Sequence, residues 1–574
     1  MVKKVFNLLN REFKNINQAA IILGFFTLLS QILGLVRDRA FAHFLGPSSS
    51  LDVYYAAFKI PDFIFVSVAS LASVTVILPF LVEKLGVKED GELNGSSAKA
   101  KKFLNDTFTV FLWAMILASA LAFILMPSLV KIVAPGFSGA ELKDLVYLSR
   151  IMVLSPIFLG LSNLFGSVTQ MFKKFFVFAL SPVFYNLGIL LGVLVLFPIF
   201  GLPGLAYGVV LGAVMHMMIQ FPVLARHKFL PKISWKIDWG SLKEMITLSL
   251  PRTIGLSLST LSLIAIIAIA SKIGTGSISI FQFSLNLQNV PLGIIGISYS
   301  VAAFPTLARF FSGGNMKEFV SYIALAARQI IFWSLPVMFL FIVLRAQIVR
   351  VILGTGQFTW QDTRLTAASL ALFAISVSAQ SLILLFTRGY YAAGNTKKPL
   401  FINLFATLLT IVSAFWLVSF FKTNEGFRFF FESLLRIEGI ANSEIVMLPL
   451  AYSLGAILNA FLLWIYFRSD FKVKDTKDSF LLKSFFQSFA GAFFMGFVAY
   501  SFLGFFDNFL NINTFWGILG QGFFSGILGI TSGYVVLKAL KNEQINQIEE
   551  TLHRKRFWKT PVTKGGDSDL HPLS

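Results

Sequence analysis

Long apolar segments recur along the whole chain, and this recurrence limits the possible folds more than any other feature. A helix needs about 20 apolar residues to cross a bilayer, and segments of this kind occur at about fourteen places. They lie at 19–37, 52–82, 104–132, 143–170, 174–199, 203–225, 245–271, 278–308, 318–344, 365–392, 399–421, 445–467, 480–505 and 513–537. Only 13% of the residues are charged, whereas soluble globular domains have about 25%. The sequence therefore predicts an all-α polytopic membrane protein with about 14 transmembrane helices.

Lysine and arginine are unevenly distributed over the loops between these segments. Counting from the N-terminal segment, alternate loops carry about three times as many basic residues as the others. Because basic loops stay on the cytoplasmic side, both termini are predicted to be cytoplasmic, and no removable signal peptide is expected. The net charge of +20 is then a topology signal, and nucleic acid is not an expected partner.

The second and eighth predicted spans share a pattern of glycine and proline. Gly46 followed by Pro61 matches Gly276 followed by Pro291, about 230 residues later. The two copies are offset by six spans and so have the same orientation, which means that the repeats should be related by an axis along the membrane normal. Prolines within long spans also predict kinked or broken helices.

This repeat predicts two lobes of six helices that face each other across a central cavity in a pseudo-twofold arrangement. The predicted parts are a cytoplasmic amphipathic N-tail at 1–18, an N-lobe at 19–228, a C-lobe at 241–468 with an outer interfacial loop at 421–444, two extra C-terminal helices at 479–540, and a cytoplasmic tail at 541–574. The tail from Asn542 onward is polar, with a basic HRKRFWK patch, and is predicted to be disordered.

Ionisable residues within the predicted spans indicate a functional site, because a charge at membrane depth costs about 3 kcal/mol on insertion scales. The basic residues of this kind are Arg37, Lys59, Arg150, Arg252 and Arg328. We expect them to line the cavity and to make it suited to an anion, since guanidinium and ammonium groups bind phosphate. Asp38, Asp52 and Asp62 are expected to hold the basic side chains in place. For Arg39, Arg150 and Arg252, an interfacial position at a helix end is the alternative.

Enzyme chemistry is not indicated by any motif. There is no phosphate-binding loop for ATP, no cysteine, and no metal-ligand spacing among the five histidines. His216 lies within a span and is expected to have a structural role. We therefore expect a transporter with no catalytic residue, no metal site and no cofactor.

Several motifs resemble those of the MurJ (MviN) family of lipid II flippases, in the MOP exporter superfamily. The segment SQILGLVRD at 30–38 is similar to the family's first-helix motif, and DVYYAAFKIP at 52–61 is similar to its second-helix motif. VPLGIIG at 290–296 and GNTKKP at 394–399 look like its eighth helix and the turn between its tenth and eleventh helices. The matches therefore extend over both lobes.

The resemblance implies alternating access and a cationic cavity that takes the pyrophosphate-sugar headgroup of lipid II. The two extra C-terminal helices would form a groove for the polyprenyl tail. The implied partners are lipid II or a related polyprenyl-pyrophosphate glycolipid, membrane lipids and other cell-wall synthesis proteins. The implied location is the bacterial inner membrane, with a role in peptidoglycan biosynthesis and cell shape.

The resemblance also implies particular substrate-binding residues. The positions that match the family motifs are Arg37, Asp38, Asp52 and Lys59. Asn286 stands where the family has an arginine in the eighth helix, and we include it among the substrate-binding candidates. Because some family arginines are missing, Arg252 and Arg328 are expected to supply compensating charge from other helices.

The prediction is thus a flippase that moves lipid II from the inner to the outer leaflet. The alternative is an exporter of another polyprenyl-pyrophosphate-linked oligosaccharide, of the capsule or O-antigen type, because the missing arginines change what the cavity selects. A cation-coupled drug exporter would need an acidic cavity, and it is disfavoured because the cavity predicted here is net basic. A non-transporting scaffold of the same fold is disfavoured because Arg37 and Lys59 are retained.

Overall fold

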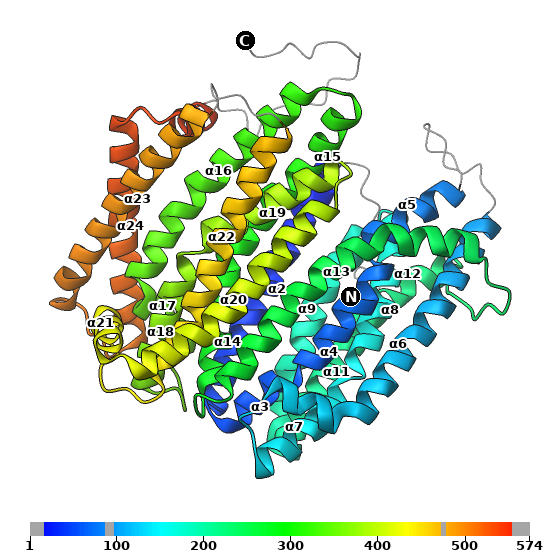
Figure 1. Cartoon of the computed structure of the whole chain (residues 1–574), viewed down its shortest axis with the longest axis horizontal. Helices are drawn as coiled ribbons and strands as arrows, with labels where there is room; N and C mark the ends of the chain where they lie inside the picture. Colours follow the sequence, from blue (N-terminus) through cyan, green and yellow to red (C-terminus); the bar gives the residue numbers. More distant parts are fainter. Residues whose placement is uncertain (1–15, 86–96, 472–477, 554–574) are drawn as a thin grey trace, which may run out of the picture.

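The computed structural model describes residues 16–85, 97–471 and 478–553, and in these ranges all regular structure is helical (Figure 1). Within these ranges, twelve helices are long and apolar enough to cross a membrane, or thirteen if the bent pair α18 (Trp360–Ala374) and α19 (Val377–Ala392) forms one span. The first predicted span falls on α2 (Ile16–Phe44), which is not among the twelve. The all-α membrane fold is confirmed, while the count of fourteen stays a prediction.

The N-lobe helices follow the predicted segments in order. After α2 they are α3 (Ser49–Ala57), α4 (Lys59–Ile64), η1 (Phe65–Ala69), η2 (Ser70–Ala72), α5 (Val74–Leu85), α6 (Ser97–Val133), α7 (Gly139–Met152), α8 (Ser155–Met171), α9 (Phe175–Leu191), η3 (Gly192–Leu196), α10 (Phe197–Phe200), α11 (Leu202–Met218) and α12 (Phe221–Arg226).

The C-lobe and the C-terminal helices also keep the predicted order. They are α13 (Trp239–Ala270), α14 (Ser277–Pro291), η4 (Leu292–Ile297), α15 (Ser298–Ser312), α16 (Met316–Val343), α17 (Arg345–Leu353), α18, α19, α20 (Lys397–Thr423), α21 (Glu425–Leu435), η5 (Ser443–Val446), α22 (Met447–Asp470), α23 (Asp478–Asp507), α24 (Phe515–Ala539) and α25 (Glu543–His553). Two short helices, α17 and α25, were not predicted, whereas α21 lies within the predicted interfacial loop at 421–444.

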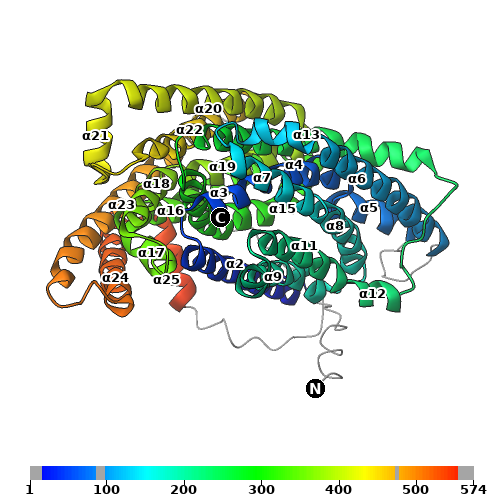
Figure 2. The same ribbon diagram turned by 90° about the horizontal axis from the view of Figure 1, so that it is seen from below.

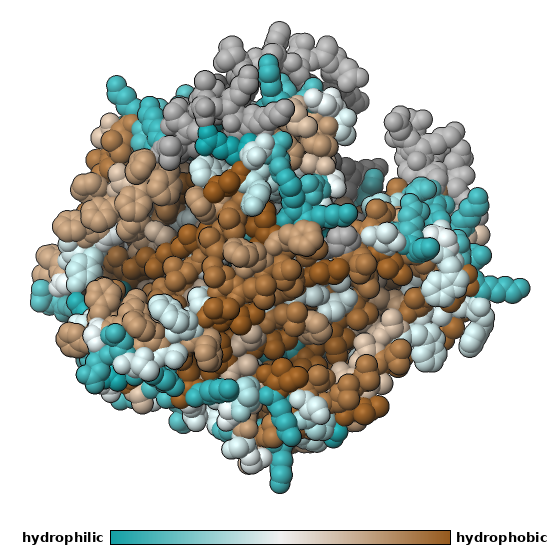
Figure 3. All heavy atoms as spheres, viewed as in Figure 1, coloured by the Kyte–Doolittle hydropathy of each residue, from teal (hydrophilic) through white to brown (hydrophobic). Residues whose placement is uncertain are grey.

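Figure 1 shows the long helices running side by side, with α23 and α24 at one edge of the bundle. We call the end that carries α3, α17 and α21 the outer end, following the predicted orientation, and the end that carries α5, α15 and α25 the inner end. Viewed from the outer end, the bundle is elongated (Figure 2). Apolar side chains cover the middle of one face and hydrophilic ones gather toward both ends (Figure 3), as expected for a membrane protein.

The second and eighth spans break in the same way, which agrees with the predicted repeat. Pro61 precedes the π-helix η1, and Pro291 precedes the π-helix η4. Proline removes a backbone donor and its ring clashes with the carbonyl four residues earlier, and a wider π-turn is a common response within a helix. The second span is broken again at Ser73, whose backbone is extended.

The N-lobe is held together by an unusually close approach of α9 and α11. A Cβ atom on Gly188 would lie 2.2 Å from the Gly212 Cα, and one on Gly208 would lie 2.4 Å from the Gly192 Cα. These glycines are spaced four residues apart on each helix. This spacing is typical of membrane helices whose backbones touch.

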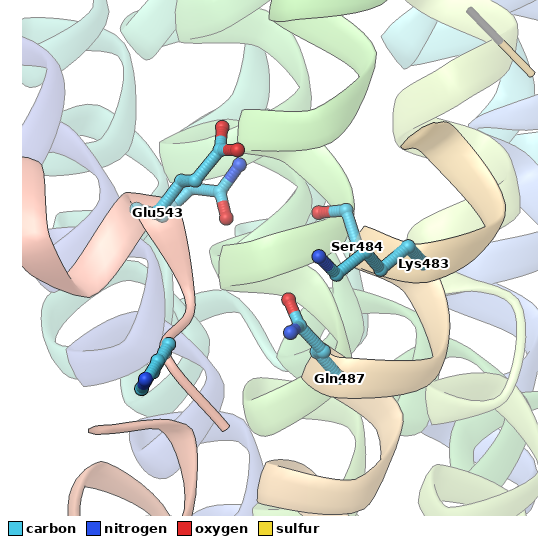
Figure 4. Close-up of a pocket in the computed structure, with 6 residues that line it drawn as sticks. Lys483, Ser484, Gln487 and Glu543 are labelled. Atoms are coloured by element: carbon cyan, nitrogen blue, oxygen red, sulfur yellow. The ribbon is translucent and has the colours of Figure 1, made fainter. Parts of the chain in front are cut away.

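The segment after α24 is helical, so the predicted disorder is wrong for residues 543–553. Asn542 is buried, and its side-chain oxygen accepts the backbone N–H groups of Gln544 and Ile545 at 3.1 and 3.4 Å, which caps the first turn of α25. Ile545 is buried beside α24 and α16. Figure 4 shows side chains of α23 facing Glu543 across the small gap beside this helix. The basic HRKRFWK patch lies mostly outside the described residues.

Candidate functional site

A cavity of about 160 Å³ lies between α2, α3 and α4 of the N-lobe and α14 of the C-lobe. Its lining combines two cations, one carboxylate, two neutral amides and four aromatic rings. The lining residues are Arg37, Phe41, Tyr54, Tyr55, Phe58, Lys59, Asp62, Gln282 and Asn286. The predicted candidates Arg37, Lys59 and Asn286 therefore meet in one place.

Arg37 is fixed by two neighbours on its N-lobe side. Its Nε and Nη2 atoms donate to one carboxylate oxygen of Asp38 at 3.0 and 2.8 Å, and Nη1 donates to the Asn186 side-chain oxygen at 3.2 Å. The Asp38 side chain is 3% exposed, whereas that of Arg37 keeps 21% exposure. Asp38 therefore orients the guanidinium, as predicted, and leaves part of it open to the cavity.

The same network continues into the C-lobe and back. The second carboxylate oxygen of Asp38 accepts from the Asn286 amide nitrogen at 2.9 Å. Asn286 in turn accepts from Gln282 at 2.9 Å, and the Gln282 oxygen accepts from Lys59 Nζ at 3.1 Å. Side chains from α9, α2, α14 and α4 thus form one continuous hydrogen-bonded chain across the interface between the lobes. Asn186 and Gln282 were not predicted.

Among the described residues, Lys59 is the cavity cation that forms no salt bridge, and its hydrogen bond goes to the neutral amide of Gln282. It is buried, and in the described part of the chain no carboxylate lies within 4 Å of its ammonium group. Asp62 also lines the cavity and lies within electrostatic reach of Lys59, but it forms no salt bridge with Lys59 or Arg37, so its predicted holding role stays a prediction. A buried ammonium bonded only to a neutral amide is favourably placed to bind an anion.

Asp52 has a different role from the predicted one. Its carboxylate is 1% exposed and accepts the backbone N–H of Gly276 at 2.7 Å, the N–H of Ser279 at 2.8 Å and the Ser279 hydroxyl at 2.6 Å. The first N–H groups of a helix have no partner within the helix and favour negative charge. Asp52 of the N-lobe therefore caps α14 of the C-lobe and does not hold a basic side chain or line the cavity.

Further contacts close the outer end. Arg39 Nη1 donates to the Val351 and Ile352 carbonyl oxygens at the end of α17, at 2.6 and 3.2 Å. His43 Nδ1 lies 2.9 Å from the Thr355 hydroxyl. Arg39 thus joins α2 to the last turn of α17, where a cation interacts favourably with the helix dipole.

Three predicted cavity residues lie elsewhere. Arg150 stacks on the Phe123 ring, 4.8 Å from its centre, at the surface between α7 and α6, as its interfacial alternative predicts. Arg252 on α13 lies within electrostatic reach of Arg388 on α19. Arg328 on α16 lies within reach of Glu543 on α25. Neither Arg252 nor Arg328 lines this cavity, whose C-lobe wall is formed by the neutral amides of Gln282 and Asn286, so their compensating role stays a prediction.

His216 has the structural role expected of it. Its Nδ1 atom lies 2.6 Å from the Ser162 hydroxyl, which also contacts the Gln220 amide at 2.5 Å. These bonds tie α11 to α8. In the described part of the chain, no group of three or more histidine or acidic residues could hold a metal ion.

Two membrane lobes, joined at the outer end and enclosing a polar cavity with broken helices on both sides, define a multi-pass transporter. A solved structure of "Lipid II flippase MurJ, inward closed conformation" matches with a TM-score of 0.70 and 21% identity, covering 92% of this chain and all of that one. An inward-facing MATE multidrug transporter of the MOP superfamily matches with a TM-score of 0.61 and 12% identity, covering 77% of this chain and 94% of that one. These similarities show that the chain shares its fold with both proteins.

The sequence comparisons identify the family. The family model "Lipid II flippase MurJ" matches residues 41–520. The probable lipid II flippase MurJ of Rickettsia prowazekii is 29% identical over 399 residues, covering 68% of this chain and 76% of that protein. The corresponding protein of Vibrio cholerae is 29% identical over 405 residues, covering 70% and 77%. The chain belongs to the MurJ family of lipid II flippases.

Proposed function

We propose that this chain moves lipid II from the inner to the outer leaflet of the bacterial inner membrane, with both termini cytoplasmic. In this proposal the cavity between the lobes receives the pyrophosphate of the headgroup. The observation that carries it is the meeting of Arg37 and Lys59 in one interlobe cavity, next to amides from the opposite lobe. Other cell-wall synthesis proteins are expected partners.

The two cations would bind the pyrophosphate from the N-lobe side. The partly exposed edge of Arg37 offers donors in a fixed plane, and Lys59 offers a mobile ammonium group. Fixed cations in a polar cavity lower the cost of bringing an anionic headgroup to membrane depth. The aromatic rings of Tyr54 and Tyr55 give this part of the cavity rigid walls.

Binding would also weaken the contact between the lobes. Lys59 must exchange the Gln282 oxygen for a phosphate oxygen, which removes one link in the chain of hydrogen bonds from α4 to α14. Because Gln282 also bonds Asn286 and Asn286 bonds Asp38, its movement disturbs the link to α2. Substrate binding and lobe movement are thereby coupled through the same side chains, as alternating access requires.

The polyprenyl tail remains in an apolar environment during this movement. We assign it to the apolar surface of α23 and α24 at the edge of the C-lobe, where α23 packs against α16 and α24 packs against α23. The family match favours lipid II over a capsule or O-antigen precursor as the transported headgroup.

The test is complementation of a bacterium depleted of its own lipid II flippase, with lipid II on the outer face quantified. The unaltered chain should restore outward lipid II, and Arg37→Ala at equal membrane abundance should not. Arg150→Ala is the matched control, because it also removes an arginine from a span but acts at the α6–α7 surface. If the unaltered chain restores nothing, or if Arg37→Ala and Arg150→Ala behave alike, the proposal is wrong.

A further inference from the structure

A second cavity, of about 580 Å³, lies at the outer end, outside the interface between the lobes. It is enclosed by the ends of α16 and α21, the starts of α17 and α18, and α23. Its lining is Ile342, Val343, Arg345, Ala346, Gln347, Trp360, Arg364, Ala367, Leu434, Leu435, Arg436, Tyr500 and Leu503. Three arginines and a mostly apolar wall thus face the same space.

The three guanidinium groups are held in place mainly by uncharged atoms. Arg345 Nη1 donates to the Ile342 carbonyl oxygen at 2.9 Å, and Arg436 Nη2 donates to the Tyr500 hydroxyl at 3.1 Å. Arg364 donates to the Arg436 carbonyl oxygen at 2.7 Å and lies 3.6 Å from a Glu438 carboxylate oxygen. Among the described residues, no carboxylate lies within 4 Å of the guanidinium of Arg345 or Arg436.

Positive charge therefore accumulates in this cavity. Burial and the nearby positive charge of Arg436 both lower the pKa of Arg345. The two guanidinium groups therefore repel each other. An anion between the two groups would remove this repulsion and supply the missing acceptors.

The backbone of Arg436 supports the same interpretation. Arg436 ends α21 in the left-handed conformation, with φ 60° and ψ 47°. Glycine or asparagine is the usual residue at such a helix end, because a side chain with a Cβ is strained there. Arg436 has this strained backbone conformation, and its side chain lines the cavity.

The position of the cavity relative to the membrane surface indicates what kind of anion it takes. The adjoining helix α21 is amphipathic, and Phe429 and Phe430 are 68% and 58% exposed; a helix of this kind lies in the membrane interface. Trp360, on the cavity rim, stacks with Arg350 at 5.0 Å, and tryptophan is enriched at the headgroup level. The arginines thus sit at headgroup depth, with Leu503 and Val343 beside them toward the apolar region.

We propose that this arginine-lined cavity binds the phosphate of a lipid headgroup at the outer membrane surface, with the first methylenes of the lipid chain against its apolar wall. Planar guanidinium groups bind phosphate oxygens in pairs, and the volume exceeds what a single phosphate fills. The lipid is either a bulk anionic phospholipid or a polyprenyl pyrophosphate, which share the same phosphate chemistry.

Lipid binding to the purified full-length chain in detergent tests this proposal, with native mass spectrometry as the readout. The probes are phosphatidylglycerol, a polyprenyl pyrophosphate, diacylglycerol, which lacks phosphate, and inorganic pyrophosphate, which lacks a chain. Arg345→Gln with Arg436→Gln should weaken binding of at least one phosphate-bearing lipid by about tenfold or more, since charged hydrogen bonds contribute about 1.5–3 kcal/mol each. Arg428→Gln with Lys131→Gln removes the same charge from exposed positions and should leave binding unchanged.

Which probe responds identifies the source of the phosphate. Preference for phosphatidylglycerol assigns the cavity to a bulk phospholipid, and preference for the polyprenyl probe assigns it to the carrier lipid of the transport cycle. Equal binding of diacylglycerol, competition by inorganic pyrophosphate at the same concentration, or an unchanged double variant would overturn the proposal. If the double variant unfolds, Arg345→Lys with Arg436→Lys retains the charge and should lose part of the affinity. Because binding is measured without transport, this result does not depend on the proposed flippase cycle.

Discussion

Single residues in the interlobe cavity act as members of a network rather than as independent charges. Asp38 illustrates this, because one of its oxygens orients Arg37 and the other accepts from Asn286 of the opposite lobe. A neutral amide, Gln282, completes the path to Lys59. The balance of charge in the cavity is therefore sensitive to a change in a residue that carries no charge itself.

Gln282→Glu should abolish transport, whereas Gln282→Met, which loses only the two amide hydrogen bonds, should retain part of it. The glutamate would form an ion pair with Lys59 in place of the present 3.1 Å hydrogen bond and would neutralise the ammonium group that the pyrophosphate needs. Methionine has a similar length and leaves that charge available. Lipid II on the outer face of complemented cells, at matched protein abundance, measures both variants. Equal activity of the two variants would contradict the assigned role of Lys59.

The sequence located the charged part of this site and only one of its neutral amides, Asn286. Arg37, Asp38 and Lys59 stand out because a charge within a membrane span is costly. Asn186 and Gln282 do not, because a single amide in an apolar helix is far less costly and has no characteristic spacing. Asp52 was misassigned because its partners at the start of α14 are 224 and 227 residues away in the sequence.

At the scale of elements, the close contact between α9 and α11 depends on glycine at each point where the backbones touch. The glycines at 188 and 192 face those at 204, 208 and 212, which is a small-residue pattern readable in the sequence. In a membrane, where lipid offers no hydrophobic force between helices, this close packing holds the pair together. Any side chain larger than a hydrogen would separate the helices.

Gly208→Val should destabilise the N-lobe by about 1–3 kcal/mol, the usual cost of overpacking a filled interface. A Cβ at this position would lie 2.4 Å from the Gly192 Cα, so backbone rather than a flexible side chain would have to move. Gly24→Ala is the control, because nothing lies within 4 Å of a Cβ there. Thermal unfolding of the purified protein measures the difference. Similar melting temperatures for the two variants would show that the helices separate without cost.

The sequence predicted long elements much better than short ones. Hydrophobic length located the spans, and prolines indicated the breaks that became η1 and η4. The short helices α17 and α25, of 9 and 11 residues, were not predicted because neither is long enough to cross a membrane. Both are held by contacts distant in sequence, such as Gln347 on α17 with Gln521 on α24 at 3.1 Å.

At the scale of the whole molecule, the two copies of the internal repeat meet each other at the outer end. Gly46 and Gly276 both have positive φ, of 58° and 85°. A Cβ on Gly276 would lie 2.8 Å from the carbonyl oxygen of Pro47, the residue after Gly46. The contacts of Asp52 and Arg39 surround this point, so the outer end is closed by bonds between the lobes. Alternating access requires these bonds to break in each cycle.

A disulfide across this closure should therefore stop transport. The chain has no cysteine, so His43→Cys with Thr355→Cys introduces a single pair, at a site where the side chains are now 2.9 Å apart. Ser334→Cys with Ser378→Cys is the control, because these hydroxyls are 2.7 Å apart but belong to α16 and α19 of one lobe. Oxidation should abolish outward lipid II only for the first pair, and a reductant should restore it. Undiminished transport with the first disulfide formed would mean that the lobes do not separate at the outer end.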